Sequence, residues 1–385
     1  MDKSIQKDIN NAVEHFRKML EEQYERNAKI AESAVTDNAE HEKTVIGLVP
    51  GDGIGPVIME ETKTVLAELL ADEIAAGRIE LNDIEGFTLE ERLAKEQTVP
   101  DEVLAQLKKC DVILKGPTTT PNAAMGGPNL ESANVFLRRE LDLFANVRPV
   151  KLPPEGIDWT FFRENTEGEY ALGSKGVKIG NELAVDFKVT TNEGTKRIAR
   201  AAYEFAKNNG KKRVSIVTKA NIMKKTDGDF QSICLDIAKE YPEIQTDTWF
   251  IDIMTANLVN KDIRNQFEVF VLPNLYGDII TDEAAQIQGG VGTAGSANIG
   301  NRYAIFEAIH GSAPRMVEEG ISHLANPASL MTAAVLMLRH IGLEDKAGKF
   351  EKAITMANDT LGAKMTGLPG GTSCHTYATM VRNSL

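Results

Sequence analysis

The sequence predicts an α/β fold in which a largely parallel sheet is covered by helices. Short apolar runs recur, and each is followed by a turn of glycine, proline or asparagine and then by a stretch with helical spacing; the runs are residues 44–49, 112–115, 214–218 and 269–272. Alternation of strands and helices is typical of parallel sheets, which bind ligands at the carboxyl ends of their strands. The length of 385 residues exceeds what one core usually serves, so we expect two folded units or one elaborated α/β unit.

The N-terminal segment is predicted to be one amphipathic helix over residues 3–34. Its apolar side chains recur three or four residues apart, at Ile5, Ile9, Val13, Phe16, Leu20 and Tyr24. Residues 34–43 are polar and are interpreted as a linker. Two placements of the helix are open: an appendage that docks on the body of the protein or on a partner subunit, or a surface helix folded back on its own domain.

The first strand, residues 44–49, leads into the glycine turn of residues 50–56 and then into a helix over residues 57–70. Gly51-Asp52-Gly53-Ile54-Gly55 is similar to the dinucleotide fingerprint GxGxxG, but its third glycine comes one residue early. A tight turn is therefore the favoured interpretation.

Two further elements are predicted later in the chain. Residues 172–191 predict two short strands, which form either a clasp at a dimer interface or a solvent-facing hairpin. Residues 332–341 predict a helix.

Composition excludes several classes of function. With 43 Lys+Arg and 56 Asp+Glu the net charge is −13, which argues against a surface that wraps nucleic acid or binds an anionic membrane. The three cysteines form no CxxC pair and are expected to be buried small hydrophobes. The N-terminus lacks the apolar region of a secretory signal, and no apolar run approaches the ~20 residues of a membrane span. We expect a soluble, cytoplasmic protein.

Several cationic side chains predict a site for a polycarboxylate. Arg138 and Arg148 lie ten residues apart, and Arg163 and Lys219 follow in positions next to turns. The planar guanidinium group matches a carboxylate with two parallel hydrogen bonds. Ser132 and Asn134 add short hydrogen-bonding side chains just before Arg138. The alternative is that such arginines form surface ion pairs, which is the interpretation we favour for Arg139 beside its acidic neighbours.

Two further motifs suggest a cation and a nucleotide. Asp278 and Asp282 are four residues apart, so on a helix they share a face and could bind a hard cation, with Asp252 as a further acid. A solvated acidic helix face is the alternative. The stretch of residues 289–300, GGVGTAGSANIG, and the following residues 307–314 would let backbone N–H groups approach a phosphate, unless the stretch is a loop without a ligand.

The order of these motifs resembles the β-decarboxylating dehydrogenase family, which contains isocitrate and isopropylmalate dehydrogenases. The segments that carry the resemblance run from about Thr44 to the C-terminus and are GDGIGP, KGPTTTP, SANVFLRRELDLFANVRP, FRENTEGEY, TKANIM, NLYGDIITD, GSANIG, HGSAP and ANPAS. The Ser-x-Asn-x-x-Leu-Arg form at residues 132–138 is similar to that of isocitrate dehydrogenases. The resemblance implies a three-layer α/β/α fold of the isopropylmalate dehydrogenase type, distinct from a Rossmann fold, with two domains and a clasp.

The resemblance also implies domains and residue roles. The helical extension would be residues 1–43, the large cofactor-binding domain residues 44–143 and 289–385, and the small domain residues 144–288 with a clasp near 169–192. Tyr170 and Lys219 match the catalytic acid/base pair. The substrate carboxylates would be bound by Ser132, Asn134, Arg138, Arg148 and Arg163. The metal ligands would be Asp252, Asp278 and Asp282. The cofactor would contact Thr119, Thr120, His310, Gly311, Ser312, Ala313, Pro314, Arg315 and Asn326.

The implied reaction is the oxidative decarboxylation of isocitrate in the tricarboxylic acid cycle, with Mg²⁺ or Mn²⁺ and with NAD or NADP. Homodimers or higher homo-oligomers are implied, in which Lys219 and Asp252 come from the neighbouring subunit. The nucleotide is left open, because Arg315 suits a 2′-phosphate whereas residues 365–371, MTGLPGG, are similar to NAD-type subunits. The alternatives are a dehydrogenase of homoisocitrate or isopropylmalate and a non-catalytic regulatory subunit.

Overall fold

The computed structural model describes residues 3–32, 43–121, 128, 130–172 and 175–385 and separates into two compact units. The first unit comprises Met1–Val35, Phe144–Asn146 and Lys151–Glu283; the second comprises Thr36–Leu143, Val147–Val150 and Ala284–Leu385. Strand β4 (Ala145–Leu152) and helix α10 (Asn274–Gln288) contribute residues to both units. Apart from Lys43, the predicted linker lies outside the described residues.

The second unit is built on five strands in the order β2-β1-β3-β12-β11. Strands β1, β2, β3 and β12 pair in parallel, whereas β11 and β12 are antiparallel. The strands are β1 (Thr44–Val49), β2 (Ile79–Asp83), β3 (Val112–Lys115), β11 (Gly295–Ile299) and β12 (Ala304–Ala308). The predicted parallel sheet is therefore present, with one antiparallel strand.

Side chains of these strands alternate between two apolar cores, because successive residues of a strand point to opposite faces. On β3, Val112 and Leu114 join one core and Ile113 joins the other. The first core is covered by α2 (Gly55–Leu69), α12 (Ala328–His340), α13 (Glu344–Leu361) and α14 (Cys374–Arg382). The second is covered by α5 (Asp101–Leu107) and α6 (Ala133–Glu140). The unit thus has the expected three layers; its short helices are α3 (Ala71–Ala75), α4 (Leu89–Ala94) and α11 (Pro314–Glu318).

The first unit contains four parallel strands in the order β5-β10-β8-β9. They are β5 (Ile157–Glu164), β8 (Arg213–Thr218), β9 (Gln245–Phe250) and β10 (Val269–Leu272). Helix α7 packs over β5, β10 and β8, and α8 packs beside α7. The helices are α1 (Lys3–Glu32), α7 (Asn192–Asn208), α8 (Thr226–Ala238) and α9 (Ile251–Val259), and a separate hairpin is formed by β6 (Val177–Ile179) and β7 (Leu183–Val185).

Most sequence-predicted elements are confirmed. Three strands have the predicted bounds, β8 begins one residue earlier, and all three cysteines are buried and free. The expectation of a phosphate-binding loop over residues 289–300 is wrong for its second half, because residues 295–299 form β11. A Cβ atom on Gly295 would lie 2.4 Å from the backbone nitrogen of Ala333, so this glycine allows α12 to pack on the strand. Within the described residues, no helix has both the length and the apolar composition needed to cross a membrane.

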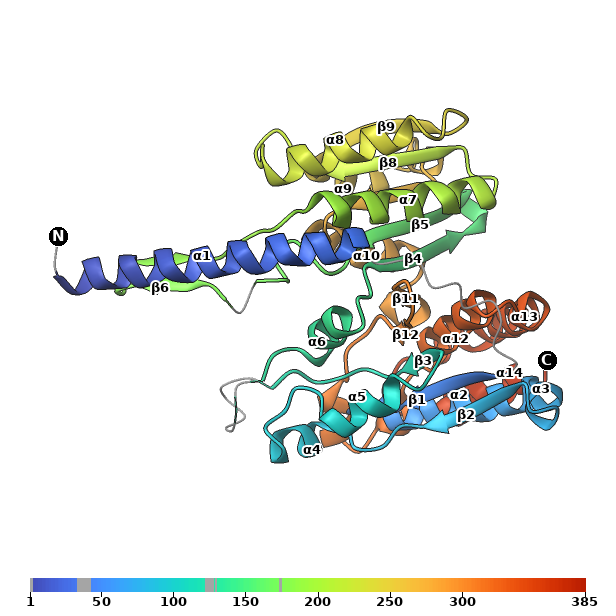
Figure 1. Ribbon diagram of the computed structural model, residues 1–385. Coiled ribbons are helices and arrows are strands. Elements are labelled where there is room, and N and C mark those ends of the chain that lie inside the picture. The colour runs from blue at the N-terminus through green and yellow to red at the C-terminus, as the bar shows by residue number, and fades with distance from the viewer. Residues whose placement is uncertain (1–2, 33–42, 122–127, 129, 173–174) are drawn as a thin grey trace. The chain divides into compact units, whose positions relative to one another are not determined.

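Helix α1 folds back along its own unit, beside α7 and the β6–β7 hairpin (Figure 1). Met19 is 2% exposed, and the rings of Phe16 and Phe187 stack at 5.2 Å. The predicted apolar row is not the buried face, because Val13, Leu20 and Tyr24 of that row are exposed. The helix is instead oriented by polar contacts, such as His15 Nε2 at 2.8 Å from the backbone oxygen of Lys175.

The carboxyl-terminal half of α1 supplies a cation to a buried acidic pair. Arg26 donates to Glu167 Oε1 at 2.8 Å and to Thr166 Oγ1 at 2.7 Å. Glu164 lies beside them and accepts from the backbone N–H of Glu167 at 2.6 Å. Burial, together with the charge of Glu167, raises the pKa of Glu164 to about 7, although Arg26 opposes the shift. The N-terminal helix therefore contributes to the electrostatic balance of the FRENTEGEY segment.

We expect the stability of the protein to fall as the pH rises from about 4.5 to about 7. The pKa of Glu164 is raised on folding, so its contribution is fully present below its ordinary pKa of 4.5 and is lost as the pH passes its folded value of about 7. Over this range the free energy of unfolding of the wild type, relative to Glu164→Gln, should fall by at most about 1.4 kcal/mol per pH unit, and by about 1 kcal/mol between pH 6 and 7. Urea titrations at pH 5, 6 and 7 measure this difference.

Glu91→Gln is the control for the titration. Hydrogen bonds from Thr88 lower the pKa of Glu91, so this variant should run parallel to the wild type above pH 5. Parallel curves for the wild type and Glu164→Gln would show that Glu164 does not titrate in this range.

Candidate active site

One cluster of predicted site residues forms in the first unit around Asp278. Arg163 Nη1 pairs with Asp278 Oδ1, and the Tyr170 hydroxyl donates to Asp278 Oδ2 at 2.6 Å. The guanidinium carbon of Arg163 lies 5.2 Å from the centre of the Tyr170 ring. Asn274 Oδ1 accepts from Arg163 Nη2 at 2.7 Å and from Nε at 3.0 Å. A cation, a carboxylate and a phenol are thus held together.

The local sequence explains this convergence. Arg163 is opposite Leu272 in the parallel pairing of β5 with β10, so both strands end at the same edge, where α10 begins with Asn274. A Cβ atom on Gly277 would lie 2.5 Å from Arg163 Cγ, so the glycine leaves room for the arginine chain. The NLYGDIITD motif therefore supplies three features at the start of α10. Asn274 provides a hydrogen-bond acceptor, Gly277 leaves room for the Arg163 side chain, and Asp278 provides a carboxylate.

A second cluster forms at the ends of β8 and β9 in the same unit. Lys219 follows β8 and pairs with Asp252 Oδ1 at 2.5 Å, while Asp252 lies in the first turn of α9. The hydrogen bond from Lys219 lowers the pKa of Asp252. The backbone N–H of Lys219 donates to Asp227 Oδ2 at 2.7 Å, which fixes the start of the turn. The predicted acid/base lysine is therefore next to a predicted metal ligand.

The predicted metal ligands fit a divalent cation only in part within one chain. Asp278 and Asp282 share a face of α10 and provide oxygen ligands of the kind that Mg²⁺ prefers. Asp252 pairs with Lys219, and no group of three His, Cys, Asp or Glu side chains with metal-binding geometry occurs among the described residues. A complete ligand set would need oxygens from outside these residues.

In the second unit, Arg138 contacts a buried acid that the sequence did not indicate. Glu307 of β12 accepts from Lys115 Nζ at 3.0 Å and from Asn298 Nδ2 at 2.8 Å, and Arg138 Nη2 lies 3.4 Å away. Burial alone would raise the pKa of Glu307, but Lys115 and Arg138 lower it to about 2. Glu307 is therefore anionic and orients Arg138. Arg138 Nε is buried without a hydrogen-bond partner among the described residues, so a donor is left for a ligand.

The other predicted substrate residues of this unit lie near Arg138 in sequence. Ser132 is the N-cap residue of α6, and Asn134 Oδ1 accepts from Thr118 Oγ1 at 3.1 Å. Arg148 is buried on β4. Arg139 forms the expected surface pair with Glu131 at 2.7 Å. Gly126 and Gly127, which precede this segment, lie outside the described residues.

The first glycine turn joins two predicted cofactor segments. The backbone N–H of Ile54 donates to the Ser312 carbonyl at 3.0 Å, and the hydroxyls of Thr119 and Ser312 are 2.7 Å apart. Gly53 has φ +63°, and a Cβ atom there would lie 1.9 Å from Ser312 O. The sequence-based interpretation of a tight turn is confirmed, and the turn positions the two segments against each other.

Asp52 and Arg92 hold this junction together and were not predicted from the sequence. Arg92 Nη2 donates to Asp52 Oδ2 at 2.7 Å and to the Thr119 carbonyl at 2.9 Å, and its side chain is fully buried. Asp52 also accepts from the N–H groups of Thr119 and Leu89, each at 2.7 Å. The capping box of Thr88 and Glu91 marks the start of α4 in the sequence, but no sequence signal indicates that the next residue is a buried cation.

The remaining predicted cofactor residues lie in the same unit. Burial lowers the pKa of His310, and its Nε2 is buried without a hydrogen-bond partner in the described part of the chain. Gly311 precedes Ser312, Ala313 is the N-cap residue of α11, and Pro314 is its first residue. Arg315 is exposed and pairs with Glu319 at 2.6 Å, while Thr120 is exposed. Asn326 Oδ1 accepts a hydrogen bond of 3.0 Å from the N–H of Ala328, the first residue of α12.

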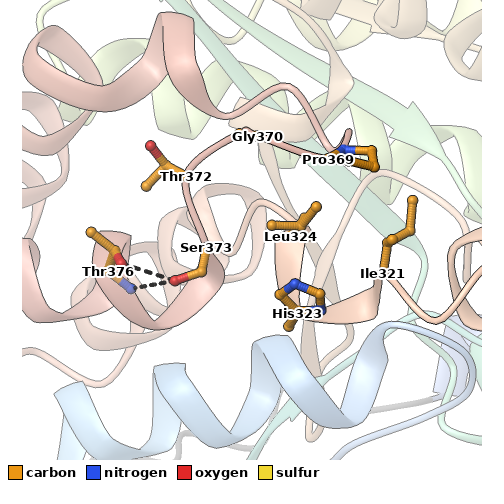
Figure 2. A pocket seen from close by; sticks show the side chains of 9 residues that line it. Ile321, His323, Leu324, Pro369, Gly370, Thr372, Ser373 and Thr376 are labelled. Carbon is orange, nitrogen blue, oxygen red and sulfur yellow. Dashed lines mark hydrogen bonds between the residues drawn. The ribbon is translucent and has the colours of Figure 1, made fainter.

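A pocket of about 600 Å³ lies between residues 321–324 and the loop of residues 369–373. Figure 2 shows Ile321, His323 and Leu324 on one side and Pro369 and Gly370 of the loop on the other. Ser373 Oγ accepts from the N–H of Thr376 at 3.1 Å and caps α14.

The sequence matches known proteins along most of its length. Residues 45–379 match the family model described as isocitrate/isopropylmalate dehydrogenase. The NADP isocitrate dehydrogenase of Rickettsia prowazekii is 42% identical over 80% of this chain, which spans only 62% of that protein. The 3-isopropylmalate dehydrogenase of Archaeoglobus fulgidus is 39% identical, covering 80% of this chain and 90% of that protein.

The structure agrees with this match. A crystal structure of isocitrate dehydrogenase from Methylococcus capsulatus superposes with a TM-score of 0.76 at 33% identity, covering 89% of this chain and 99% of that chain. The chain therefore belongs to the isocitrate/isopropylmalate dehydrogenase family.

We predict that Asp52→Asn destabilises the protein by about 3 kcal/mol or more, because it leaves the buried Arg92 charge without its counter-charge. Chemical denaturation measures the loss, and Asp52→Asn combined with Arg92→Met should recover part of it. Glu240→Gln, which breaks the exposed pair with Arg200, is the control and should cost less than about 1 kcal/mol. Equal losses in the two single variants would contradict a structural role for the buried pair.

Proposed function

We propose that this chain is a metal-dependent isocitrate dehydrogenase, which converts isocitrate into 2-oxoglutarate and CO₂ and transfers a hydride to NAD or NADP. The observation that carries the proposal is the cluster of Arg163, Tyr170 and Asp278, where a buried cation and a phenol share one carboxylate. The similarity to isocitrate dehydrogenases of Rickettsia and Methylococcus supports the same reaction.

The arginines would bind the carboxylates of the substrate. Arg138 is held by Glu307 and keeps a buried Nε donor, Arg148 is buried, and Arg163 is fixed by Asn274. Arginines that are already oriented suit a trianionic substrate, because their guanidinium groups need not reorganise when the substrate binds. Ser132 and Asn134 would add hydrogen bonds to the same substrate.

Tyr170 and Lys219 would move the protons. Lys219 Nζ would help to remove the proton of the substrate hydroxyl while the C–H hydride leaves for the nicotinamide. After CO₂ departs, the Tyr170 hydroxyl would protonate the carbon that carried it. Its hydrogen bond to Asp278 at 2.6 Å holds the phenol in place for this step.

Asp278 and Asp282 would hold the divalent cation together with Asp252 from a second copy of the chain. A bound Mg²⁺ or Mn²⁺ supplies positive charge that stabilises the developing oxyanion of the substrate. A homodimer with shared sites would explain why Asp252 and Lys219 form a cluster of their own. The exposed Leu183 and Val185 of the two-stranded hairpin support such an assembly, because an isolated hairpin is marginally stable in water.

A second candidate substrate is 3-isopropylmalate. It is supported by the similarity to the 3-isopropylmalate dehydrogenase of Archaeoglobus fulgidus, because the alignment covers 90% of that protein. Both substrates present a 2-hydroxy acid to the same acid/base groups. They differ in the third substituent, on the carbon that carries the departing carboxylate, which is a negatively charged carboxymethyl group in isocitrate and an apolar isopropyl group in 3-isopropylmalate. A non-catalytic regulatory role is disfavoured, because Tyr170, Lys219 and the three aspartates are all present.

We expect reduced nucleotide to form, by absorbance at 340 nm, only when isocitrate, a divalent cation and NAD or NADP are all present. The assay crosses isocitrate and 3-isopropylmalate with both nucleotides, with Mn²⁺ and with a chelator. Tyr170→Phe should lower kcat at least about 100-fold through loss of the proton donor. Turnover of 3-isopropylmalate alone would replace the proposed substrate, and no turnover of either would refute the proposal.

We expect Arg315→Asp to weaken the use of NADP at least about tenfold in kcat/KM and to leave NAD use within about twofold, because the arginine would pair with the 2′-phosphate. Arg315 is exposed and is held only by Glu319 among the contacts described, so the charge can reach a ligand. Arg302→Asp, a change of the same charge in another surface turn, is the control. Equal losses with both nucleotides would show that Arg315 does not distinguish them.

A further inference from the structure

Lys188 lies at the centre of a buried polar group in the first unit. Its side chain is only 7% exposed, and Nζ lies 2.6 Å from Asp227 Oδ1 and 3.2 Å from Glu169 Oε1. The same nitrogen is 3.4 Å from the Tyr276 hydroxyl and 4.4 Å from the centre of that ring. One ammonium group therefore meets two carboxylates and an aromatic ring.

Each contact leads to a different predicted active-site residue. Glu169 directly precedes Tyr170, and Tyr276 lies two residues before Asp278. Asp227 binds Lys188 through Oδ1, and its Oδ2 accepts from the backbone N–H of Lys219 at 2.7 Å. The Tyr170 and Lys219 segments come from separate parts of the chain, and Lys188 contacts both through their neighbours.

The backbone on either side of Lys188 is also fixed. Val189 and Gly168 exchange hydrogen bonds of 2.8 and 3.2 Å in an isolated antiparallel bridge. On the other side, Phe187 stacks on Phe16 of α1 at 5.2 Å. The backbone at Lys188 is therefore held in place. Its side chain can fix the positions of Glu169, Asp227 and Tyr276, which a lysine on a flexible segment could not do.

A second lysine–aspartate pair of the first unit, Lys211 with Asp158, contacts none of the predicted active-site residues within the described part of the chain. Lys211 pairs with Asp158 at 2.5 Å and donates to the Asp158 carbonyl at 3.0 Å. Lys211 lies in the connection between α7 and β8, and Asp158 lies near the start of β5 with a side chain that is 57% exposed. Asp227 is fully buried whereas Asp158 is largely exposed, so forming the pair of Lys188 and Asp227 costs more desolvation. Burial works to lower the pKa of Lys188, but Asp227 and Glu169 outweigh it and raise the pKa, so the ammonium group stays charged.

We propose that Lys188 is a positioning residue for two kinds of catalytic segment. Through Glu169 and Tyr276 it holds the segments of Tyr170 and Asp278, which would serve one site, and through Asp227 it holds the segment of Lys219, which would serve the site shared with the second copy of the chain. The inference rests on the proposed dehydrogenase function and adds to it a residue that touches no reacting group. Misplacement of catalytic groups by about 1 Å can cost on the order of 100-fold in rate, which sets the size of the expected effect.

The test compares Lys188→Met and Lys188→Arg with the wild type and with Lys211→Met as the matched control. Lys188→Met should lower kcat at least about tenfold and change KM less than about threefold, because binding groups such as Arg163 remain in place. Lys188→Arg keeps the charge and should recover at least a third of the wild-type kcat. Lys211→Met should stay within about twofold of the wild type.

A second measurement does not depend on turnover. Acetylation of Lys219 by acetic anhydride, followed by peptide mass spectrometry, should be at least about threefold faster in Lys188→Met, because Asp227 no longer fixes its turn. Lys239, which is exposed, is the internal reference. If the wild type turns over neither substrate, the proposed function fails, and this labelling rate alone decides the positioning role.

The outcomes are separable. A loss of kcat below about threefold together with an unchanged labelling rate would overturn the proposal, and so would a Lys188→Arg variant as impaired as Lys188→Met. Circular dichroism checks that the variants are folded. If Lys188→Met does not fold, the double variant Lys188→Gln with Asp227→Asn removes both charges together, and the same criteria apply to it.

Discussion

The cost of removing charged groups from water is the constraint on which both units depend. Arg92 is fully buried and Arg163 is 1% exposed, and neither could remain charged there without a partner. Each is paired with an aspartate and also hydrogen-bonded to a second segment, Thr119 for Arg92 and Asn274 for Arg163. The pairs therefore connect segments that are distant in sequence, and the connected segments are those that carry the family motifs. Stability and site geometry have the same physical origin here.

This arrangement has a consequence for chemistry. A buried charge that is already satisfied by hydrogen bonds has a fixed orientation, so it can stabilise charge on a ligand without reorganising. Glu307 shows the principle, because the same carboxylate is held anionic by Lys115 and in turn orients Arg138. In the first unit, Asp278 likewise accepts hydrogen bonds from both Arg163 and Tyr170 and so orients these two side chains. The protein thus combines a net charge of −13 with buried arginines whose orientation is fixed by carboxylates.

The N-terminal helix follows the same rule although it lies outside the family match, which begins at residue 45. Its orientation is set less by its apolar row than by Met19 and by polar contacts, among them Arg26 with Glu167. Glu167 accepts from the backbone N–H of Thr191 at 2.8 Å, and Thr191 caps α7. The extension therefore adds a cation to a segment of the family fold that ends at Tyr170, rather than forming a separate module.

By itself, the sequence determined the strand–turn–helix order, the bounds of β1, β3 and β10 and the membership of the family, because apolar runs and turn residues act locally. It also indicated Arg163, Tyr170 and Asp278, which the structure brings together. Only the tertiary structure decided that Glu307 orients Arg138, that Asp52 meets Arg92, that residues 295–299 are a strand, and that the predicted apolar row of α1 is largely exposed. These outcomes depend on which charges and which faces become buried together. Arg138 and Glu307 are 169 positions apart in the chain, so no local sequence pattern indicates that they come into contact.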